Sequence, residues 1–324
     1  MQLSSEKKTA DMRSAYGDTL VELGGIYHNL VCVGADTTDS LKTMKFGDKY
    51  PDRMFNIGIA EANLVSVAAG LAIAGRIAFA STYAAFLPGR CLDQIRNTIC
   101  YPNLNVKLVV SHAGLTVGPD GASHQQIEDF STMRAIPNMR VIVPADAVAV
   151  RALIRVITTT SGPFYVRLAR PSSEVLYAED ETTFNIGKGN ILYDGSDGTI
   201  ISCGLMVARS LEAAEILKKN KGISCRVIDM FSIKPVDTEL ITKCSRETGS
   251  IVTVEEHNVI GGLGGAVAEA SSESYPVPIR RVGVRDVFGE SARDEELDAL
   301  LEKYGLTSTQ IAQAVIECRS RIKR

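Results

Sequence analysis

Several features that mark common classes of protein are missing from this chain of 324 residues. It has no tryptophan and four histidines, and aromatic side chains make up 6% of the sequence. Its seven cysteines stand singly and form no CxxC pair, which argues against both a disulfide framework and a zinc site. We therefore expect reduced, buried thiols and a cytoplasmic protein.

Blocks of like charge are also missing. Lysine and arginine number 35, aspartate and glutamate number 38, and the net charge is −3. The basic run RSRIKR stands at the very end of the sequence. This balance argues against nucleic acid as the main ligand. The first residues, MQLSSEKKTADMR, lack the apolar core of a signal peptide.

One stretch, MFNIGIAEANLVSVAAGLAIAG at 54–75, is long enough to span a membrane. Its single charged residue is Glu61. A charge at the centre of a spanning helix costs roughly 2.5–3.5 kcal/mol, so we expect a buried strand, turn and helix, and no membrane. A lone carboxylate in such a run needs a partner, contact with solvent, or a proton to carry.

Short apolar runs alternate with helical segments along the chain, which indicates an α/β fold. Strands are expected at 30–36, 54–60, 77–82, 106–114, 140–146, 163–170, 199–204, 224–230, 250–256 and 279–286. Helices are expected at 63–75, 89–101, 147–159, 208–220, 237–247, 264–274 and 293–303. The polar stretch 171–189 has the composition of a linker. We predict two doubly wound, mainly parallel-sheet domains, residues 1–185 and 186–324.

Ligands of such sheets bind beyond the carboxyl ends of the strands. There SHAGLTVGPDGASHQQIEDF, 111–130, is expected to form a long glycine-rich loop, with a type I turn at GPDG, 118–121. The loop carries His112, Asp120 and His124. Three interpretations stay open: a metal site, an ordered loop whose histidines bond only to the backbone, or, as we favour, a polar site for a hydroxylated substrate.

Three further motifs have both a structural and a functional interpretation. In STYAAFLPGR, 81–90, Phe86 is either a core residue or, with Tyr83, a flat platform for a heteroaromatic ligand. VIGGLGGAVAEA, 259–270, does not fit a GxGxxG phosphate loop in register, so close packing of a strand and a helix is favoured. EEH, 255–257, ends a strand and is either a site or solvated charge.

Five segments occur in an order that resembles transketolases: FNIGIAEANLVSVAAGLAIAG, STYAAF, HAGLTVGPDGASHQ, RAIPNMRVIVPAD and VTVEEHNVIGGLGGAVAE. The resemblance covers nearly the whole chain, but only the last two domains of a full-length transketolase, the pyrimidine-binding and C-terminal domains. It implies the C-terminal subunit of a split transketolase. Such an enzyme transfers a two-carbon ketol unit from a ketose phosphate to an aldose phosphate in the pentose phosphate pathway.

The resembling family uses thiamine diphosphate and holds the diphosphate through Mg²⁺ or Ca²⁺ with a GDG…N motif in its first domain. That motif is absent from this chain. The resemblance therefore implies no metal ligands here and an N-terminal partner subunit that supplies them. It also implies a homodimer of this chain at the core of an α2β2 heterotetramer, with the active site between chains.

The resemblance assigns roles to single residues as well. Glu61 matches the glutamate that hydrogen-bonds the aminopyrimidine ring of the cofactor, so its partner is expected outside this chain. The other cofactor contacts are expected from Phe86, which stacks on the pyrimidine, Tyr83 and Asp36. The sugar hydroxyls are expected to meet His112, Asp120 and His124, and the substrate phosphate to meet Arg170, Arg13 and Ser40. Where full-length transketolases usually have GED, this chain has GPD at 118–120, so loop shape and donor preference can differ.

Three other functions compete with this interpretation. The β-subunit of a 2-oxoacid dehydrogenase has a similar two-domain plan and cofactor glutamate, but needs no sugar-binding HAG…GPDGASHQ loop or phosphate clamp. Deoxyxylulose-phosphate synthase is similar around IAEAN and GLAIAG. Both use pyruvate as donor. A non-catalytic scaffold subunit is the fourth possibility, although it is expected to lose some of the residues named above.

Overall fold

The computed structural model describes residues 8–181 and 183–322. Its larger sheet has seven strands in the order β12-β6-β7-β5-β4-β2-β3, and every neighbouring pair is parallel except the one formed by β12 and β6. The strands are β2 (Leu30–Gly34), β3 (Met54–Asn56), β4 (Ile77–Tyr83), β5 (Val106–Ser111), β6 (Arg140–Ile142), β7 (Phe164–Arg167) and β12 (Ser232–Lys234).

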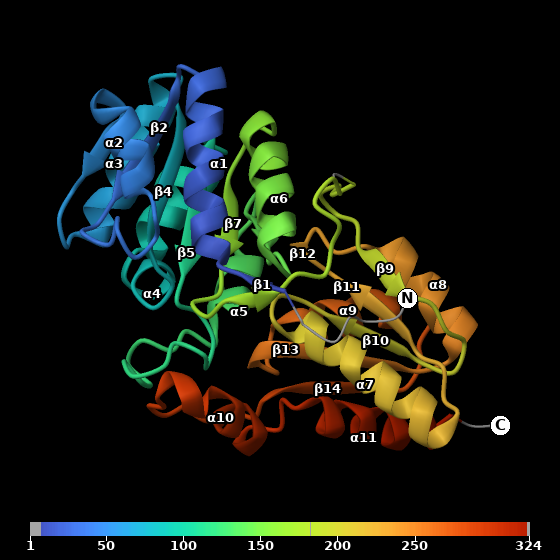
Figure 1. Ribbon diagram of the computed structural model, residues 1–324. Coiled ribbons are helices and arrows are strands. Elements are labelled where there is room, and N and C mark those ends of the chain that lie inside the picture. The colour runs from blue at the N-terminus through green and yellow to red at the C-terminus, as the bar shows by residue number, and fades with distance from the viewer. Residues whose placement is uncertain (1–7, 182, 323–324) are drawn as a thin grey trace.

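Helices cover both faces of this sheet (Figure 1). Helices α1 (Met12–Ile26) and α6 (Ala147–Thr159) pack together over one face. The other face is covered by α3 (Glu61–Ile73), the π-helix η2 (Gln94–Cys100), α4 (Leu87–Arg90) and α5 (Asp129–Ala135). Two short elements, α2 (Met44–Lys49) and η1 (Pro51–Arg53), lie between β2 and β3.

The second sheet has five strands in the order β14-β13-β10-β11-β9, parallel except at β9. They are β9 (Asn190–Tyr193), β10 (Thr199–Ser202), β11 (Arg226–Asp229), β13 (Ile251–Asn258) and β14 (Ile279–Val284). The helices around it are α7 (Met206–Lys221) and α11 (Ser308–Arg319), which pack together, then α8 (Thr238–Thr248) and α9 (Leu263–Ser274), and η3 (Asp294–Glu296) with α10 (Leu297–Lys303).

The two sheets share an apolar core. One cluster of buried side chains includes Val110 and Tyr165 from the first sheet and Ile201 and Ile228 from the second. Strand β12, from the second half of the chain, completes the edge of the first sheet. A small sheet of β1 (Thr9–Ala10) and β8 (Ser173–Glu174) lies outside both. The predicted α/β class with two mainly parallel sheets is confirmed, while the boundary at 185 stays a prediction.

Most predicted elements lie where the sequence places them, and α6 has the predicted bounds. The helix predicted at 89–101 is wrong as one element, because α4 and η2 divide it. Helices α1, α2, α5 and α11 and strands β1, β8, β9 and β12 were not predicted. All seven cysteines are free and buried, as expected. No helix in the described part of the chain has the length and apolar character that a membrane span requires.

Candidate functional site

Glu61 is the first residue of α3 and is buried, with 5% of its surface exposed. Arg90, the last residue of α4, donates from Nη1 to both carboxylate oxygens at 3.1 Å. Glu61 therefore has a charged partner within this chain that the sequence did not indicate, while its contact with the cofactor stays a prediction. The carboxylate sits at a helix N-terminus, where free backbone N–H groups favour negative charge.

A group of rings lies beside this ion pair. Tyr83 ends β4, and its ring stacks at 5.8 Å on that of Phe86, which is half-buried. The guanidinium carbon of Arg90 lies 4.2 Å from the centre of the Phe86 ring, a cation–π distance. His124 meets the same ring edge-on at 5.2 Å. Phe86 thus forms a platform between polar groups, which favours the ligand-platform interpretation over the core one.

His112 follows β5 and stacks on the Tyr83 ring at 4.0 Å. Its backbone has a φ of 59°, an uncommon value for a residue with a side chain and typical of functional sites. Ser111 Oγ and His112 Nδ1 share a hydrogen bond of 2.6 Å. Burial, and then the positive charges of Arg13 and Arg170, lower the pKa of His112 to about 3. The imidazole is therefore neutral at physiological pH.

Tyr83 also connects the rings to the start of α1. Its hydroxyl donates to Ser40 Oγ at 3.0 Å, and Arg13 Nη1 lies 3.5 Å from the Ser40 carbonyl. Arg13 is itself paired with Asp11, its Nε lying 3.2 Å from Oδ1. Asp11 is fixed in place because it caps α1, accepting from the Arg13 backbone N–H at 2.8 Å. The structure thus brings Arg13, Ser40 and Tyr83 together.

Arg170 lies in the irregular segment after β7 and forms an ion pair with Asp294 of η3, at 2.6 Å from Nη1 and 3.2 Å from Nη2. The predicted turn at GPDG is present, because Gly121 N donates to the Gly118 carbonyl at 3.3 Å. Asp120 in this turn is exposed, and its charge acts on Arg170. The GPDG turn and Arg170 therefore lie close together in the structure.

Asp36 forms hydrogen bonds with Asn56, the last residue of β3. Its backbone N–H donates to Asn56 Oδ1 at 2.9 Å, and Asn56 Nδ2 donates back to its carboxylate at 3.2 Å. Asp36 is exposed, with a φ of 61°. Both residues stand at carboxyl ends of strands, the edge where ligands of parallel sheets bind. A cofactor role for Asp36 stays a prediction.

The EEH motif is buried at the contact between the two halves, so the interpretation as solvated charge is wrong. Glu255 accepts from the backbone N–H groups of Leu263 and Gly264, at 2.6 and 2.8 Å, at the N-terminus of α9. Its carboxylate thus stands where a phosphate would be held by a glycine loop. Burial raises the pKa of Glu255 to about 7. A side chain at Gly264 would meet Arg281 at 2.8 Å, which confirms the expected close packing at this glycine.

Glu256 and Arg167 join the loop of residues 111–130 to the second half of the chain. Glu256 Oε1 accepts from the Thr116 backbone N–H at 2.7 Å, and Arg167 Nη2 donates to the Glu256 carbonyl at 2.9 Å. Gly114 leaves room for both side chains, because a Cβ there would approach Arg167 Nη2 to 2.8 Å. The loop that carries the two site histidines is therefore supported by the second half of the chain.

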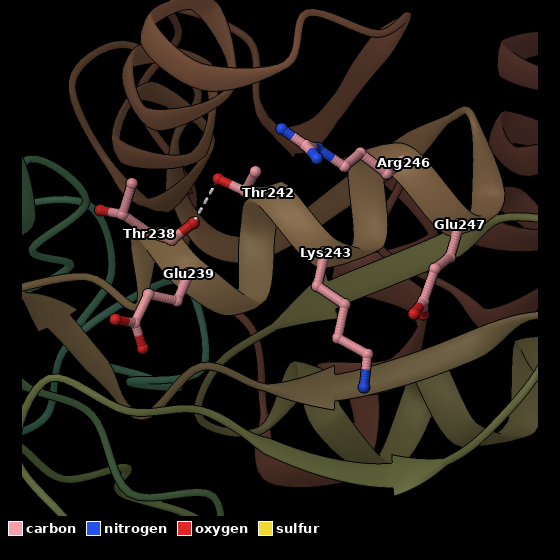
Figure 2. Close-up of a pocket in the computed structure, with 6 residues that line it drawn as sticks. All are labelled: Thr238, Glu239, Thr242, Lys243, Arg246 and Glu247. Atoms are coloured by element: carbon pink, nitrogen blue, oxygen red, sulfur yellow. Dashed lines mark hydrogen bonds between the residues drawn. The ribbon is translucent and has the colours of Figure 1, made fainter.

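Two other findings bear on the choice of site. A hollow of about 570 Å³ lies over α8, and Figure 2 shows the six residues that line it: Thr238, Glu239, Thr242, Lys243, Arg246 and Glu247. Such mixed charges on one helix face are typical of a solvated surface, and no predicted site residue lines it. Within residues 8–181 and 183–322, no three histidine, cysteine, aspartate or glutamate side chains gather as metal ligands.

Comparison with known families agrees with this geometry. Residues 8–174 match the family profile of the transketolase pyrimidine-binding domain, and residues 187–311 match that of the transketolase C-terminal domain. The chain belongs to the transketolase family. It corresponds to the C-terminal section of these enzymes and spans about half of the full-length human transketolase, with which it shares 36% identity over 94% of its own length.

Several transketolase relatives match this chain over nearly their whole length. The chain is 50% identical over 308 residues to a protein of Methanocaldococcus jannaschii described as a transketolase C-terminal section, covering 94% of this chain and 95% of that protein. It is 40% identical to a 6-deoxy-6-sulfo-D-fructose transketolase subunit of a Clostridium species, covering 96% and 95%. A solved structure named as a split gene transketolase, inactive β4 tetramer, matches with a TM-score of 0.89 and 49% identity over 96% of this chain and 99% of that one.

Sequence reasoning missed three residues that lie at this candidate site. Arg90 had a signal, since it stands one helical turn after Phe86 and is close to it in sequence. Asp11 also had one, because an aspartate before a helix is a typical N-cap. Asp294 had none, because 124 residues separate it from Arg170.

Proposed function

We propose that this chain is the C-terminal subunit of a two-chain, thiamine-diphosphate-dependent transketolase. In the proposed reaction a two-carbon ketol unit passes from a ketose phosphate to an aldose phosphate. The observation that carries the proposal is the pair of Glu61 and Phe86. Between them lies a flat, N–H-bearing group, the Arg90 guanidinium, which donates to the carboxylate and stacks on the ring.

The residues present fit the pyrimidine half of thiamine diphosphate. An aminopyrimidine is, like a guanidinium, flat and rich in nitrogen, so it suits a buried carboxylate beside an aromatic face. Glu61 is proposed to hold its ring nitrogen, Phe86 to stack on it, and Tyr83 and Asp36 to complete the pocket. When bound, the cofactor supplies the carbanion-stabilising chemistry that breaking a ketose carbon–carbon bond requires. Glu61 would hold and return the proton at that nitrogen.

The substrate contacts are proposed at the other side of the rings. His112 is neutral and His124 lies beside Phe86, so both imidazoles are available to donate to or accept from sugar hydroxyls. Asp120 is proposed to accept from a further hydroxyl. Arg170, Arg13 and Ser40 are proposed to bind the terminal anionic group, because the arginine fork pairs with phosphate oxygens in two places.

A second chain is part of the proposal. The sequence has no GDG…N motif, so the diphosphate and its Mg²⁺ or Ca²⁺ are assigned to an N-terminal transketolase subunit in an α2β2 assembly. The name of the solved split-gene relative, an inactive tetramer of β chains, supports the view that such chains need a partner.

A pyruvate-using enzyme is the second candidate function. The chain is 38% identical to the 1-deoxy-D-xylulose-5-phosphate synthase of Trichormus variabilis, of which it covers 49%. A 2-oxoacid dehydrogenase β-subunit also uses pyruvate-type donors. The sugar-binding loop and the arginine pair favour a ketose phosphate donor over both. A scaffold subunit without chemistry is disfavoured because Glu61, both loop histidines, Asp120 and Arg170 are all present.

The test is reconstitution with a candidate N-terminal subunit from the same genome, thiamine diphosphate and Mg²⁺. Each chain alone and the mixture are assayed with a ketose phosphate, a sulfonated ketose and pyruvate as donors. We expect turnover of a ketose donor by the mixture and none by either chain alone. Turnover of pyruvate in place of ketoses would transfer the assignment to the second candidate, and an inactive mixture that assembles would favour the scaffold.

A further inference from the structure

Arg170 and Asp294 form an ion pair between the two halves of the chain. The two Asp294 oxygens accept from two different Arg170 nitrogens, at 2.6 and 3.2 Å. This parallel arrangement is also the one that the arginine fork uses to bind a phosphate. Asp294 therefore occupies the positions that an anionic substrate group would take on Arg170.

The Arg170–Asp294 pair lies against the loop of residues 111–130. Ser291 Oγ donates to the Pro119 carbonyl at 2.6 Å, and Ala292 N–H donates to the Gly118 carbonyl at 3.4 Å. A Cβ at Gly118 would lie 3.0 Å from Asp294 Oδ1 and 3.1 Å from Arg170 Nη1. Residues 291–294 thus form a strap from the second half of the chain over the turn that carries Asp120. Figure 1 shows the loop between β5 and α5 beside the start of α10.

The two arginines of this site differ in how their carboxylates are held. Asp11, the partner of Arg13, is a helix cap with backbone and side-chain bonds. The side chain of Asp294 is 61% exposed, and that of Arg170 is 25% exposed. An exposed ion pair of this kind is weak, so Asp294 is the carboxylate that a ligand can displace. After displacement the Asp294 carboxylate stays near the bound anion, because the hydrogen bonds of Ser291 and Ala292 hold the backbone of residues 291–294 against the turn.

We propose that Asp294 is a specificity-determining residue of the anion subsite, where its carboxylate competes for Arg170 and repels bound anions in proportion to their charge. Asp294 therefore disfavours dianionic sugar phosphates relative to singly charged groups such as sulfonates. This inference rests on the proposed role of Arg170 in binding the anionic end of a substrate. The repulsion between unit charges about 4–6 Å apart in water corresponds to a factor of about three to six in affinity for each ligand charge.

The test uses two probes of similar size, methyl phosphate at pH 8, where it is a dianion, and methanesulfonate, a monoanion. Both are titrated by NMR or calorimetry into the full chain, without partner or cofactor. The variant is Asp294→Asn. The control is Asp298→Asn, which removes a nearby exposed carboxylate that pairs with Arg209 and not with Arg170. Arg170→Met locates the binding, and thermal unfolding confirms that each variant folds.

We expect Asp294→Asn to raise the affinity for methyl phosphate about tenfold and that for methanesulfonate about threefold, with no change in Asp298→Asn and loss of binding in Arg170→Met. An unchanged ratio of the two affinities, or weaker phosphate binding in Asp294→Asn, overturns the inference and makes Asp294 a support for Arg170. Absence of methyl phosphate binding to both wild type and Asp294→Asn overturns it as well. Because this assay needs no turnover, its failure is separate from failure of the proposed ketol transfer.

Discussion

The ion pair of Glu61 and Arg90 gives a prediction that needs neither cofactor nor partner. The perturbation is a double-mutant cycle of Glu61→Gln, Arg90→Met and the double variant in the free chain. Because one carboxylate accepts two contacts of 3.1 Å from one guanidinium nitrogen, removing either partner should remove the same interaction. The two single effects should therefore not add.

The expected magnitude follows from the unequal burial of the two side chains. The side chain of Glu61 is 6% exposed and that of Arg90 is 54% exposed. Breaking a fully buried pair costs about 3–5 kcal/mol, while an exposed pair is worth about 0–1 kcal/mol. This pair is solvated on one side only, so we expect a coupling free energy of about 1–2 kcal/mol. Arg90→Met should lose a further ~0.5–1 kcal/mol from the contact with Phe86.

The assay is urea unfolding of all four proteins at one fixed protein concentration, since association between subunits shifts the midpoint. Arg96→Met is the matched control, because Arg96 is exposed and bonds to its neighbour Asn97; it should change stability by less than about 0.5 kcal/mol. Additive single effects, with a coupling near zero, would refute the view that Arg90 is the partner of Glu61.

Two further predictions concern the second half of the chain. Gly262→Ala should destabilise the protein by about 1–3 kcal/mol, because the new Cβ would overlap the buried Glu255 carboxylate and lie 2.7 Å from His257 Nδ1. The control, Gly265→Ala, should be tolerated, because the nearest neighbour of its Cβ lies at 3.3 Å. Equal unfolding midpoints for the two variants would contradict this prediction. Burial raises the pKa of Asp229 from 3.8 to about 8, so at this residue folded protein holds a proton that unfolded protein loses, and the contribution of Asp229 to stability should fall as pH rises from 4 to 8. Asp229→Asn should remove that fall, and parallel pH–stability curves for the two proteins would show the assignment to be wrong.

The fold could be predicted where local signals agree with the final packing. Helix α6 has an aspartate cap, Asp146, and an apolar stripe, so both its ends were predictable. Helix α1 was missed because glycines lower helix propensity. Its Gly24 is required by tertiary packing, since a Cβ there would lie 2.6 Å from both the Phe46 and Tyr50 rings. Strand β12 was missed because three residues gain strand structure only by pairing with a distant edge.

The candidate site could likewise be predicted in one part and not in the other. Residues close to the quoted motifs, such as Phe86, Tyr83 and His112, were predicted and lie together in the structure. Partners that reach the site from elsewhere were not, because a single sequence does not show which distant side chains meet. Asp294 is the clearest case. The roles of the predicted residues toward cofactor and substrate remain proposals.

The central claim is that Glu61 belongs to half of an active site that a second chain completes. The most direct measurement compares wild type and Glu61→Gln, each mixed with the N-terminal subunit, thiamine diphosphate and Mg²⁺, for ketol transfer and, by analytical ultracentrifugation, for assembly. The account predicts that both assemble, that the wild-type mixture turns over, and that the variant is slower by about 100-fold or more. Near-normal turnover by the assembled variant, or turnover by the wild-type chain without its partner, would contradict it.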